Sequence, residues 1–164
     1  MHKKGFTLLE LIISIVIISL LTAIGSIGYT DIIQNARNAK RKSDLRELQL
    51  AIEKYYQDQG AYPDTSGQPI CSFDHPTDYI PDLVSDGYIQ KLPQDPTVGR
   101  KNQSIGICSM AGVTTACYMY TSNGINYKLS AYCTPEGTLD TNDVFYDSIY
   151  PGLWSVYTRG AFAW

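Results

Sequence analysis

Residues 5–30 read GFTLLELIISIVIISLLTAIGSIGYT, and this stretch decides the architecture of the chain. It follows Lys3 and Lys4, and the part from Leu11 to Thr30 holds 20 residues without a charge. About 20 apolar residues are enough for a helix to cross the hydrocarbon of a bilayer. The stretch therefore predicts a membrane helix. Glu10 lies near the N-terminal end of this expected helix. Burying a carboxylate in a membrane costs free energy unless a partner compensates its charge.

The helical pattern continues beyond the apolar segment. Apolar residues recur at steps of three and four from residue 31 to residue 58, which predicts one apolar helix face: they are Ile32, Ile33, Ala36, Ala39, Leu45, Leu48, Ile52, Tyr55 and Tyr56. No proline occurs between Phe6 and Tyr62. We therefore expect one helix from Phe6 to about Asp58, roughly 80 Å long at 1.5 Å per residue. Gly60 and Pro63 supply its stop.

Four basic residues lie just beyond the apolar segment, and we expect them to form a solvated helix face: they are Arg37, Lys40, Arg41 and Lys42. Asp44 and Glu47 stand three or four residues from basic partners, which is the spacing of exposed ion pairs on a helix.

Two alternatives compete for the N-terminal segment. In a secretory signal peptide, Lys3 and Lys4 would be the basic region and Ala23-Ile24-Gly25 the cleavage site. In a plain membrane anchor, the two lysines would hold the N-terminus in the cytoplasm and Glu10 would have no specific role. The helical phase shared by the apolar segment and residues 31–58 weighs against a cleaved signal peptide.

The composition changes near residue 60. After Gly60 the chain has 5 Lys and Arg against 10 Asp and Glu, which argues against a nucleic-acid site. All four cysteines lie in this later part, and an even number behind a membrane-targeting segment predicts disulfides in an oxidising compartment: they are Cys71, Cys108, Cys117 and Cys133. Their spacing lacks the close pairs of a zinc site, and three disulfide pairings remain open.

The later part also carries signals for a small sheet. Residues 60–115 are rich in proline, glycine and aspartate and read as irregular, with a short helix near residues 79–86. Residues 117–133 alternate around Asn123-Gly124, the strongest short signal for a β-hairpin. We expect one face of this hairpin to pack on the helix and the other to meet solvent.

Two further strands are expected at residues 145–150 and 153–158. A small antiparallel sheet packed on the amphipathic half of a long helix is an α+β fold.

The N-terminal motif resembles the processing motif of type IV prepilins and of type II secretion pseudopilins. It joins a short basic leader, a glycine before a phenylalanine, a glutamate four residues later and a long apolar helix. The resemblance implies that a prepilin peptidase cuts between Gly5 and Phe6, that Phe6 becomes N-methylated, and that Glu10 is the assembly glutamate. The partner of Glu10 would be the new amine of Phe6 on a neighbouring subunit.

The family usually has a proline late in the apolar half, where this chain has Ile27. Gly25 and Gly28 flank that position and are either a substitute weak point of the helix or small residues for close helix packing.

Two later stretches resemble the major, G-type pseudopilin of type II secretion. They are Gly60-Ala-Tyr-Pro63 and Asp86-Gly-Tyr-Ile-Gln-Lys-Leu-Pro-Gln-Asp-Pro96. The chain departs from that family in two ways: Thr97-Val98-Gly99 replaces a tryptophan-glycine pair, and four cysteines are present. The resemblance also implies a calcium ion in a C-terminal loop, and its ligands here would be Asp140 and Asp143. The alternative is that these residues only form turns.

The sequence thus predicts a pilin-like filament subunit rather than an enzyme, because it shows no catalytic constellation. Its expected parts are a leader (1–5), a transmembrane and filament-core half-helix (6–30), an amphipathic half-helix (31–59), and a globular head (60–164). The head consists of a loop region (60–115) and a part with the β-hairpin and the C-terminal strands (116–164).

Expected partners are copies of the chain, prepilin peptidase, an inner-membrane assembly platform and membrane lipid. The expected location is the cytoplasmic membrane and then an extracytoplasmic or cell-surface filament. A secretion pseudopilus and a type IV pilus remain alternatives. So does a monomeric binding domain, anchored or secreted.

Overall fold

The structure is a computed structural model that describes residues 5–26, 29–100 and 115–164, without the side chains of residues 23–26. Contacts divide the chain into two units, residues 1–36 and residues 37–164. The first unit contains helix α1 (Leu8–Ser26) and the start of helix α2 (Tyr29–Gln59). Residues 27 and 28, where the sequence predicts an unbroken helix and where Ile27 and Gly28 lie, are outside the described residues.

Helix α2 ends where the sequence predicts. Gly60 follows its last residue with a φ of 74°, and its N–H donates to the carbonyl oxygen of Tyr56 at 2.8 Å. This left-handed residue with a bond back to the last turn is a common helix C-terminus, and glycine adopts it without a Cβ clash.

Four antiparallel strands form one sheet in the order β1 (Ile70–Cys71), β2 (Cys117–Ser122), β3 (Tyr127–Tyr132) and β4 (Trp154–Tyr157). A short 3₁₀ helix, η2 (Arg159–Ala161), follows β4. The predicted hairpin is β2–β3, paired from Cys117 with Tyr132 to Ser122 with Tyr127.

The turn of this hairpin is closed by the Asn123 side chain. Its Oδ1 accepts the backbone N–H groups of Ile125 and Asn126 at 3.1 and 2.8 Å.

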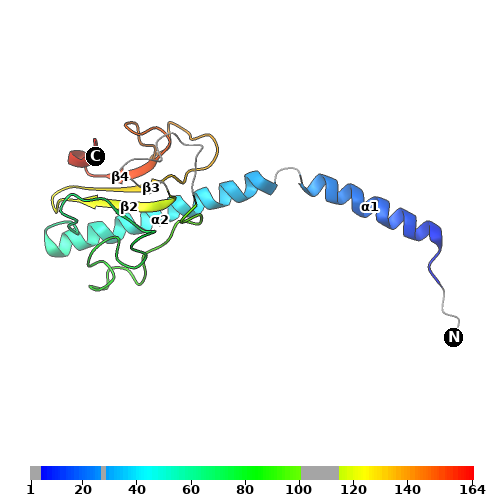
Figure 1. Ribbon diagram of the computed structural model, residues 1–164, viewed down its shortest axis with the longest axis horizontal. Coiled ribbons are helices and arrows are strands. Elements are labelled where there is room, and N and C mark those ends of the chain that lie inside the picture. The colour runs from blue at the N-terminus through cyan, green and yellow to red at the C-terminus, as the bar shows by residue number, and fades with distance from the viewer. Residues whose placement is uncertain (1–4, 27–28, 101–114) are drawn as a thin grey trace. The chain divides into compact units, whose positions relative to one another are not determined.

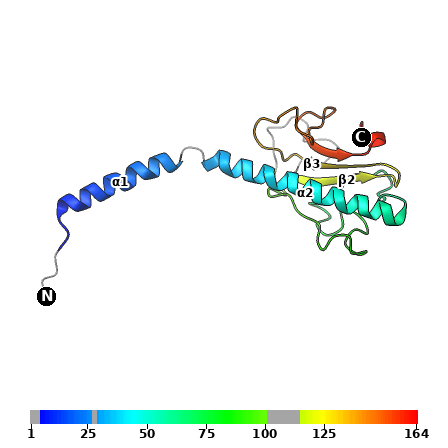
Figure 2. The ribbon, with the colours of Figure 1, turned by 180° about the vertical axis from the view of Figure 1, so that it is seen from behind.

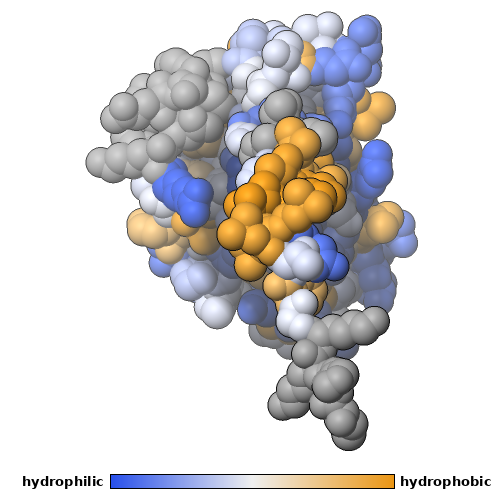
Figure 3. Space-filling view, turned by 90° about the vertical axis from the view of Figure 1, so that its right-hand side faces the viewer, coloured by the Kyte–Doolittle hydropathy of each residue, from blue (hydrophilic) through white to orange (hydrophobic). Residues whose placement is uncertain are grey.

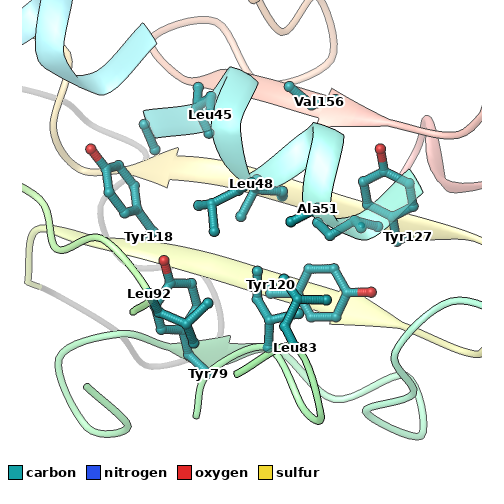
Figure 4. Close-up of a cluster of buried hydrophobic side chains, with 14 of the residues drawn as sticks. Leu45, Leu48, Ala51, Tyr79, Leu83, Leu92, Tyr118, Tyr120, Tyr127 and Val156 are labelled. Atoms are coloured by element: carbon teal, nitrogen blue, oxygen red, sulfur yellow. The ribbon is translucent and has the colours of Figure 1, made fainter. Parts of the chain in front are cut away.

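Helix α2 lies along the sheet (Figure 1 and Figure 2), and the side chains of the head core fill the space between them. Leu45, Leu48 and Ala51 point from the helix toward β2 and β3, where Tyr118, Tyr120 and Tyr127 meet them (Figure 4). Loop residues complete the cluster: Tyr79, Ile80, Leu83 and Leu92. The α+β fold expected from the sequence is confirmed, with the apolar face of α2 as its base.

The sheet differs from expectation on its second face. Instead of meeting solvent, that face is buried by a second apolar cluster, whose members are Cys71, Cys117, Met119, Tyr132, Cys133 and Leu153. Every residue of β3 is buried. The segment after β3 supplies the cover, because Leu153 packs into this cluster together with the half-buried Tyr150.

Two short elements were predicted wrongly. Residues 79–86 form turns rather than a helix, because Pro81 precedes Asp82 in the left-handed region at a φ of 63°. Residues 145–150 make only an isolated bridge, between Tyr146 and Trp154. Strand β1, by contrast, lies in the region that the sequence indicated to be irregular.

Candidate assembly site

The first turn of α1 is closed by a reciprocal pair of side chains. The Glu10 Oε2 atom accepts the Thr7 backbone N–H at 3.0 Å and the Thr7 hydroxyl at 2.9 Å. In return the Glu10 N–H donates to Thr7 Oγ1 at 3.3 Å. This is a capping box, which satisfies amide groups that the first turn of a helix leaves free. Glu10 therefore has a partner within its own chain and remains exposed.

The rest of the described α1 surface is apolar and exposed. Figure 3 shows these side chains gathered on the segment. Exposed large apolar residues are Leu8, Leu9, Leu11, Ile12, Ile13, Ile15, Val16, Ile17, Ile18, Leu20 and Leu21. An apolar surface of this extent on a helix marks a site of contact with lipid or with other proteins.

The hydroxyl groups within this surface are satisfied inside the helix. Ser14, Ser19 and Thr22 each donate to the carbonyl oxygen four residues earlier at 2.7 Å. Because these hydroxyls already have partners, none of them needs water or a neighbouring chain. Glu10 is the carboxylate at the N-terminal end of this surface.

The predicted cleavage site lies in non-helical backbone before α1. Phe6 is 84% exposed, and a Cβ placed on Gly5 would meet nothing within 4 Å. The packing of the chain therefore gives no reason for a glycine at position 5.

Within the described ranges, no helix has both the length and the apolar character needed to cross a membrane. The predicted span 6–30 includes residues 27 and 28, which lie outside those ranges, so it stays a prediction.

The basic cluster of α2 is only partly a solvated face: Lys40 is exposed as expected, Arg37 and Lys42 are half-buried, and the expectation was wrong for Arg41. Arg41 is fully buried, and its guanidinium contacts Asp95 through Nε at 2.7 Å and through Nη2 at 3.2 Å. The same Nη2 donates to Thr97 Oγ1 at 2.9 Å. Arg37 binds Glu136 with an Nη2 to Oε2 distance of 2.8 Å. These cations hold two loops of the head against α2.

Asp44 connects the same helix to the sheet. It is fully buried, forms an ion pair with Lys40, and accepts the Tyr118 hydroxyl at 2.7 Å. Burial first, and then the neighbouring Asp44 carboxylate, raise the pKa of Tyr118 far above its usual value. The hydroxyl therefore stays protonated and keeps donating to Asp44.

Two of the four cysteines pair within the described residues. Cys71 on β1 and Cys117 on β2 form a disulfide with a Cα–Cα distance of 5.9 Å. Cys133 is also disulfide-bonded, whereas Cys108 lies outside the described residues. The predicted disulfide chemistry is confirmed for the Cys71–Cys117 pair, which ties the edge strand to the hairpin.

Asp140 and Asp143 do not converge on a calcium site. Asp143 forms an ion pair with Lys42 and accepts the Phe145 N–H at 3.1 Å. Asp140 Oδ1 accepts the backbone and side-chain N–H groups of Asn142 at 2.9 and 3.2 Å. Calcium needs six to eight convergent oxygens, and the described residues contain no group of three or more metal-ligating side chains. The residues therefore do not fit the predicted ion.

Burial alone would raise the pKa of the Asp143 carboxyl. The hydrogen bonds from Lys42 and Phe145, with the charges of Lys42 and Arg46, outweigh burial and hold that pKa below its usual value. Asp143 is therefore ionised near neutral pH and bound to a cation that the chain itself provides.

Comparison with known proteins gives two family matches. Residues 1–26 match the prokaryotic N-terminal methylation motif, and residues 29–103 match type II secretion system (T2SS) protein G. No solved structure matches the chain.

Several curated proteins are similar to the chain. Type II secretion system core protein G of Klebsiella pneumoniae is 34% identical over 100 residues, which are 58% of this chain and 69% of that protein. The core protein G of Dickeya chrysanthemi is 28% identical over 145 residues, covering 87% of this chain and 84% of that protein. For the relative from Pectobacterium carotovorum subsp. carotovorum, 34% identical over 98 residues, the match covers 58% of this chain and slightly less than two thirds, 62%, of that protein.

Proposed function

We propose a function for this chain from the fact that it belongs to the type II secretion system protein G family. The family is one of structural pseudopilins and not of enzymes. The proposed role is that of a subunit which polymerises through its N-terminal helix into a secretion filament. Family membership favours this role over that of a type IV pilus subunit.

The observation that carries the proposal is the surface of α1. It exposes an apolar face whose hydroxyls are satisfied inside the helix, and it places one carboxylate, Glu10, at the N-terminal end. Phe6 is exposed just ahead of this carboxylate. Packing of such helices against one another would remove water from around Glu10, where an ion pair is stronger than at an exposed site.

We propose that cleavage between Gly5 and Phe6 creates the partner of Glu10. The new amine of Phe6 on one subunit would bind the Glu10 carboxylate of the next. A buried charge pair of this kind sets the register between helices, and this is the best-attested use of buried polar groups. The Thr7 hydroxyl and N–H hold Glu10 until that amine arrives.

The remaining partners follow from this route. Prepilin peptidase would cut and methylate the chain, membrane lipid would surround α1 before assembly, and an inner-membrane platform would add subunits to the filament. The head would be periplasmic, outside the cytoplasmic membrane, where the Cys71–Cys117 disulfide is stable.

The test replaces Glu10 by alanine in cells that assemble the filament. We expect the mature chain still to start at a methylated Phe6, measured by N-terminal sequencing and intact mass, while sheared filaments disappear. Asp31→Asn is the matched control, because it removes an exposed carboxylate in the first turn of α2. Filaments of Glu10→Ala in normal amount would remove Glu10 from the mechanism. A mature chain that starts at Ser26 would favour the secreted, monomeric alternative.

A further inference from the structure

The segment between β3 and β4 carries three aspartates, Asp140, Asp143 and Asp147. Like charges repel one another, and positive charge nearby offsets that repulsion. In this chain the positive charge comes from two lysines on different elements. Lys42 belongs to α2 and Lys128 belongs to β3.

The first lysine engages Asp143. The ammonium of Lys42 forms an ion pair with Asp143 Oδ2, while Asp143 Oδ1 accepts the Phe145 N–H at 3.1 Å. Both carboxylate oxygens are therefore in use. The same ammonium lies 4.7 Å from the centre of the Trp154 ring, where a cation is attracted to the face of the aromatic system.

The second lysine engages Asp147. The ammonium of Lys128 lies 2.8 Å from Asp147 Oδ2 as an ion pair, and both side chains are buried, with 6% and 0% exposed. Asp147 Oδ1 accepts the N–H groups of Ile149 and Tyr150 at 3.0 and 3.1 Å. Lys128 also donates to the Trp164 carbonyl oxygen at 2.8 Å and lies 4.6 Å from the Tyr150 ring centre.

These contacts engage the two carboxylates that a divalent cation would have to bind. The Oδ2 atoms of Asp143 and Asp147 each form an ion pair with a lysine ammonium, and their Oδ1 atoms accept backbone amides. Asp147 Oδ2 accepts no hydrogen bond within the described residues, so the ion pair with Lys128 is what compensates its charge. The two lysines come from separate elements. A calcium ion on either aspartate would have to displace an ammonium that an aromatic ring also holds. Two fixed positive charges would meanwhile oppose its entry.

We propose that Lys42 and Lys128 anchor the 139–149 loop to the head in place of a bound divalent cation, so that the head folds independently of calcium. The proposal concerns the folding of the head and does not depend on whether the chain assembles into filaments.

The first test is thermal unfolding of the full-length chain in detergent, followed by circular dichroism, with EDTA and with millimolar calcium. We expect the same melting temperature in both, because a ligand stabilises a protein only when it binds the folded state. An increase of about 4 °C or more with calcium would overturn the proposal.

The second test uses Lys42→Gln and Asp143→Asn, because these side chains are partly exposed and their variants should still fold. Each change should lower the melting temperature, and the double variant should melt about where the single variants do, since the two residues form one interaction. Lys91→Gln is the control, an exposed lysine on another loop. A Lys42→Gln chain that melts with the parent would contradict the anchoring role of Lys42.

Discussion

Arg41 is a guanidinium buried in the head, and every contact that it makes joins helix α2 to a loop or to its own preceding turn. It binds Asp95 through two nitrogens, donates to Thr97, and donates to Asn38 Oδ1 at 2.8 Å. A planar guanidinium can make such a set of bonds at once, and a lysine ammonium cannot match its geometry. Arg41 is therefore a fixed connection between α2 and the segment after Pro93.

Removal of one partner of this pair should be costly. We expect Arg41→Met to lower the free energy of unfolding by about 3–5 kcal/mol, because Asp95 would remain charged and buried without its cation. Urea unfolding monitored by circular dichroism measures the change. The control is Arg46→Met, since Arg46 is exposed and its guanidinium lies over the Phe145 ring at 5.2 Å.

A double variant distinguishes the ion pair from simple packing. Arg41→Met with Asp95→Asn should recover part of the loss, because no unpaired charge is then left in the core. Asparagine keeps an oxygen that can accept the Thr97 N–H and hydroxyl, which Asp95 Oδ1 accepts at 2.7 Å each. If the double variant is less stable than Arg41→Met alone, the pair is not the cause of the destabilisation.

The sequence predicted Arg41 on a solvated face, although the spacing of the core residues held a signal for its burial. Residues 41, 45, 48 and 52 follow one another at steps of four, three and four, so Arg41 lies on the same helix face as three core residues. Asp95 lies 54 residues away in the chain, and no local pattern connects the two. The same reason hid the pairing of Lys42 with Asp143, 101 residues apart.

At the scale of the elements, the Cys71–Cys117 disulfide holds the shortest strand, β1, against β2. Strand β1 has two residues, too few to pair stably alone, and the Cys71–Cys117 bond joins it to β2. The bond closes a loop with a sequence separation of 46. In the chain-entropy model a loop of this length contributes about 4 kcal/mol to stability.

We therefore expect Cys71→Ser with Cys117→Ser to lower the free energy of unfolding by about 4 kcal/mol. Urea unfolding of the variant and of the parent under oxidising conditions measures the difference. Met119→Leu is a volume-conserving control on the same strand and should cost less than about 1.5 kcal/mol. Equal stability of the double variant and the parent would show that strand pairing holds β1 without the bond.

The elements that the sequence predicted correctly are those with local causes. The β2–β3 hairpin follows from alternation around Asn123-Gly124, and the end of α2 follows from Gly60. The failures have distant or side-chain causes. Residues 145–150 turn because Asp147 Oδ1 accepts two backbone amides. The N-terminal motif from Gly5 to Glu10 could be found because all its residues are adjacent, whereas the anchoring ion pairs of the head span the chain.

At the scale of the whole molecule, the head is built around tyrosines. Burial, followed by the charge of Glu53, raises the pKa of Tyr62 to about 12. Tyr127 donates to Glu53 at 3.0 Å, and burial again is the main cause of its raised pKa. Burial likewise raises the pKa of three more hydroxyls of the head, those of Tyr79, Tyr118 and Tyr120.

These raised pKa values predict a loss of stability in alkali. The unfolded chain releases its tyrosine protons near pH 10, but the folded head keeps them. Above pH 10 each such tyrosine should therefore lower the free energy of unfolding by about 1.4 kcal/mol per pH unit until its own folded-state pKa is reached. Stability is unaffected by these groups below pH 10, where both states keep the proton.

The ultraviolet absorbance of tyrosinate, recorded with circular dichroism during an alkaline titration, checks this. We expect the buried tyrosines to ionise together with unfolding, and Tyr127→Phe to make the decline in stability less steep. Complete ionisation near pH 10 in a head that is still folded would contradict the prediction.

The internally bonded hydroxyls of Ser14, Ser19 and Thr22 have a consequence for how a subunit would be exchanged. For a chain that assembles as proposed, these groups need no new partners when α1 leaves lipid and enters a filament. Apolar side chains also gain little from that transfer, because lipid is as apolar as a neighbouring helix. The free energies of α1 in lipid and of α1 in the filament would then be nearly equal. The ion pair of Glu10 would decide which of the two is favoured. A filament of such subunits is suited to reversible growth, in which the membrane serves as a reservoir for subunits that return.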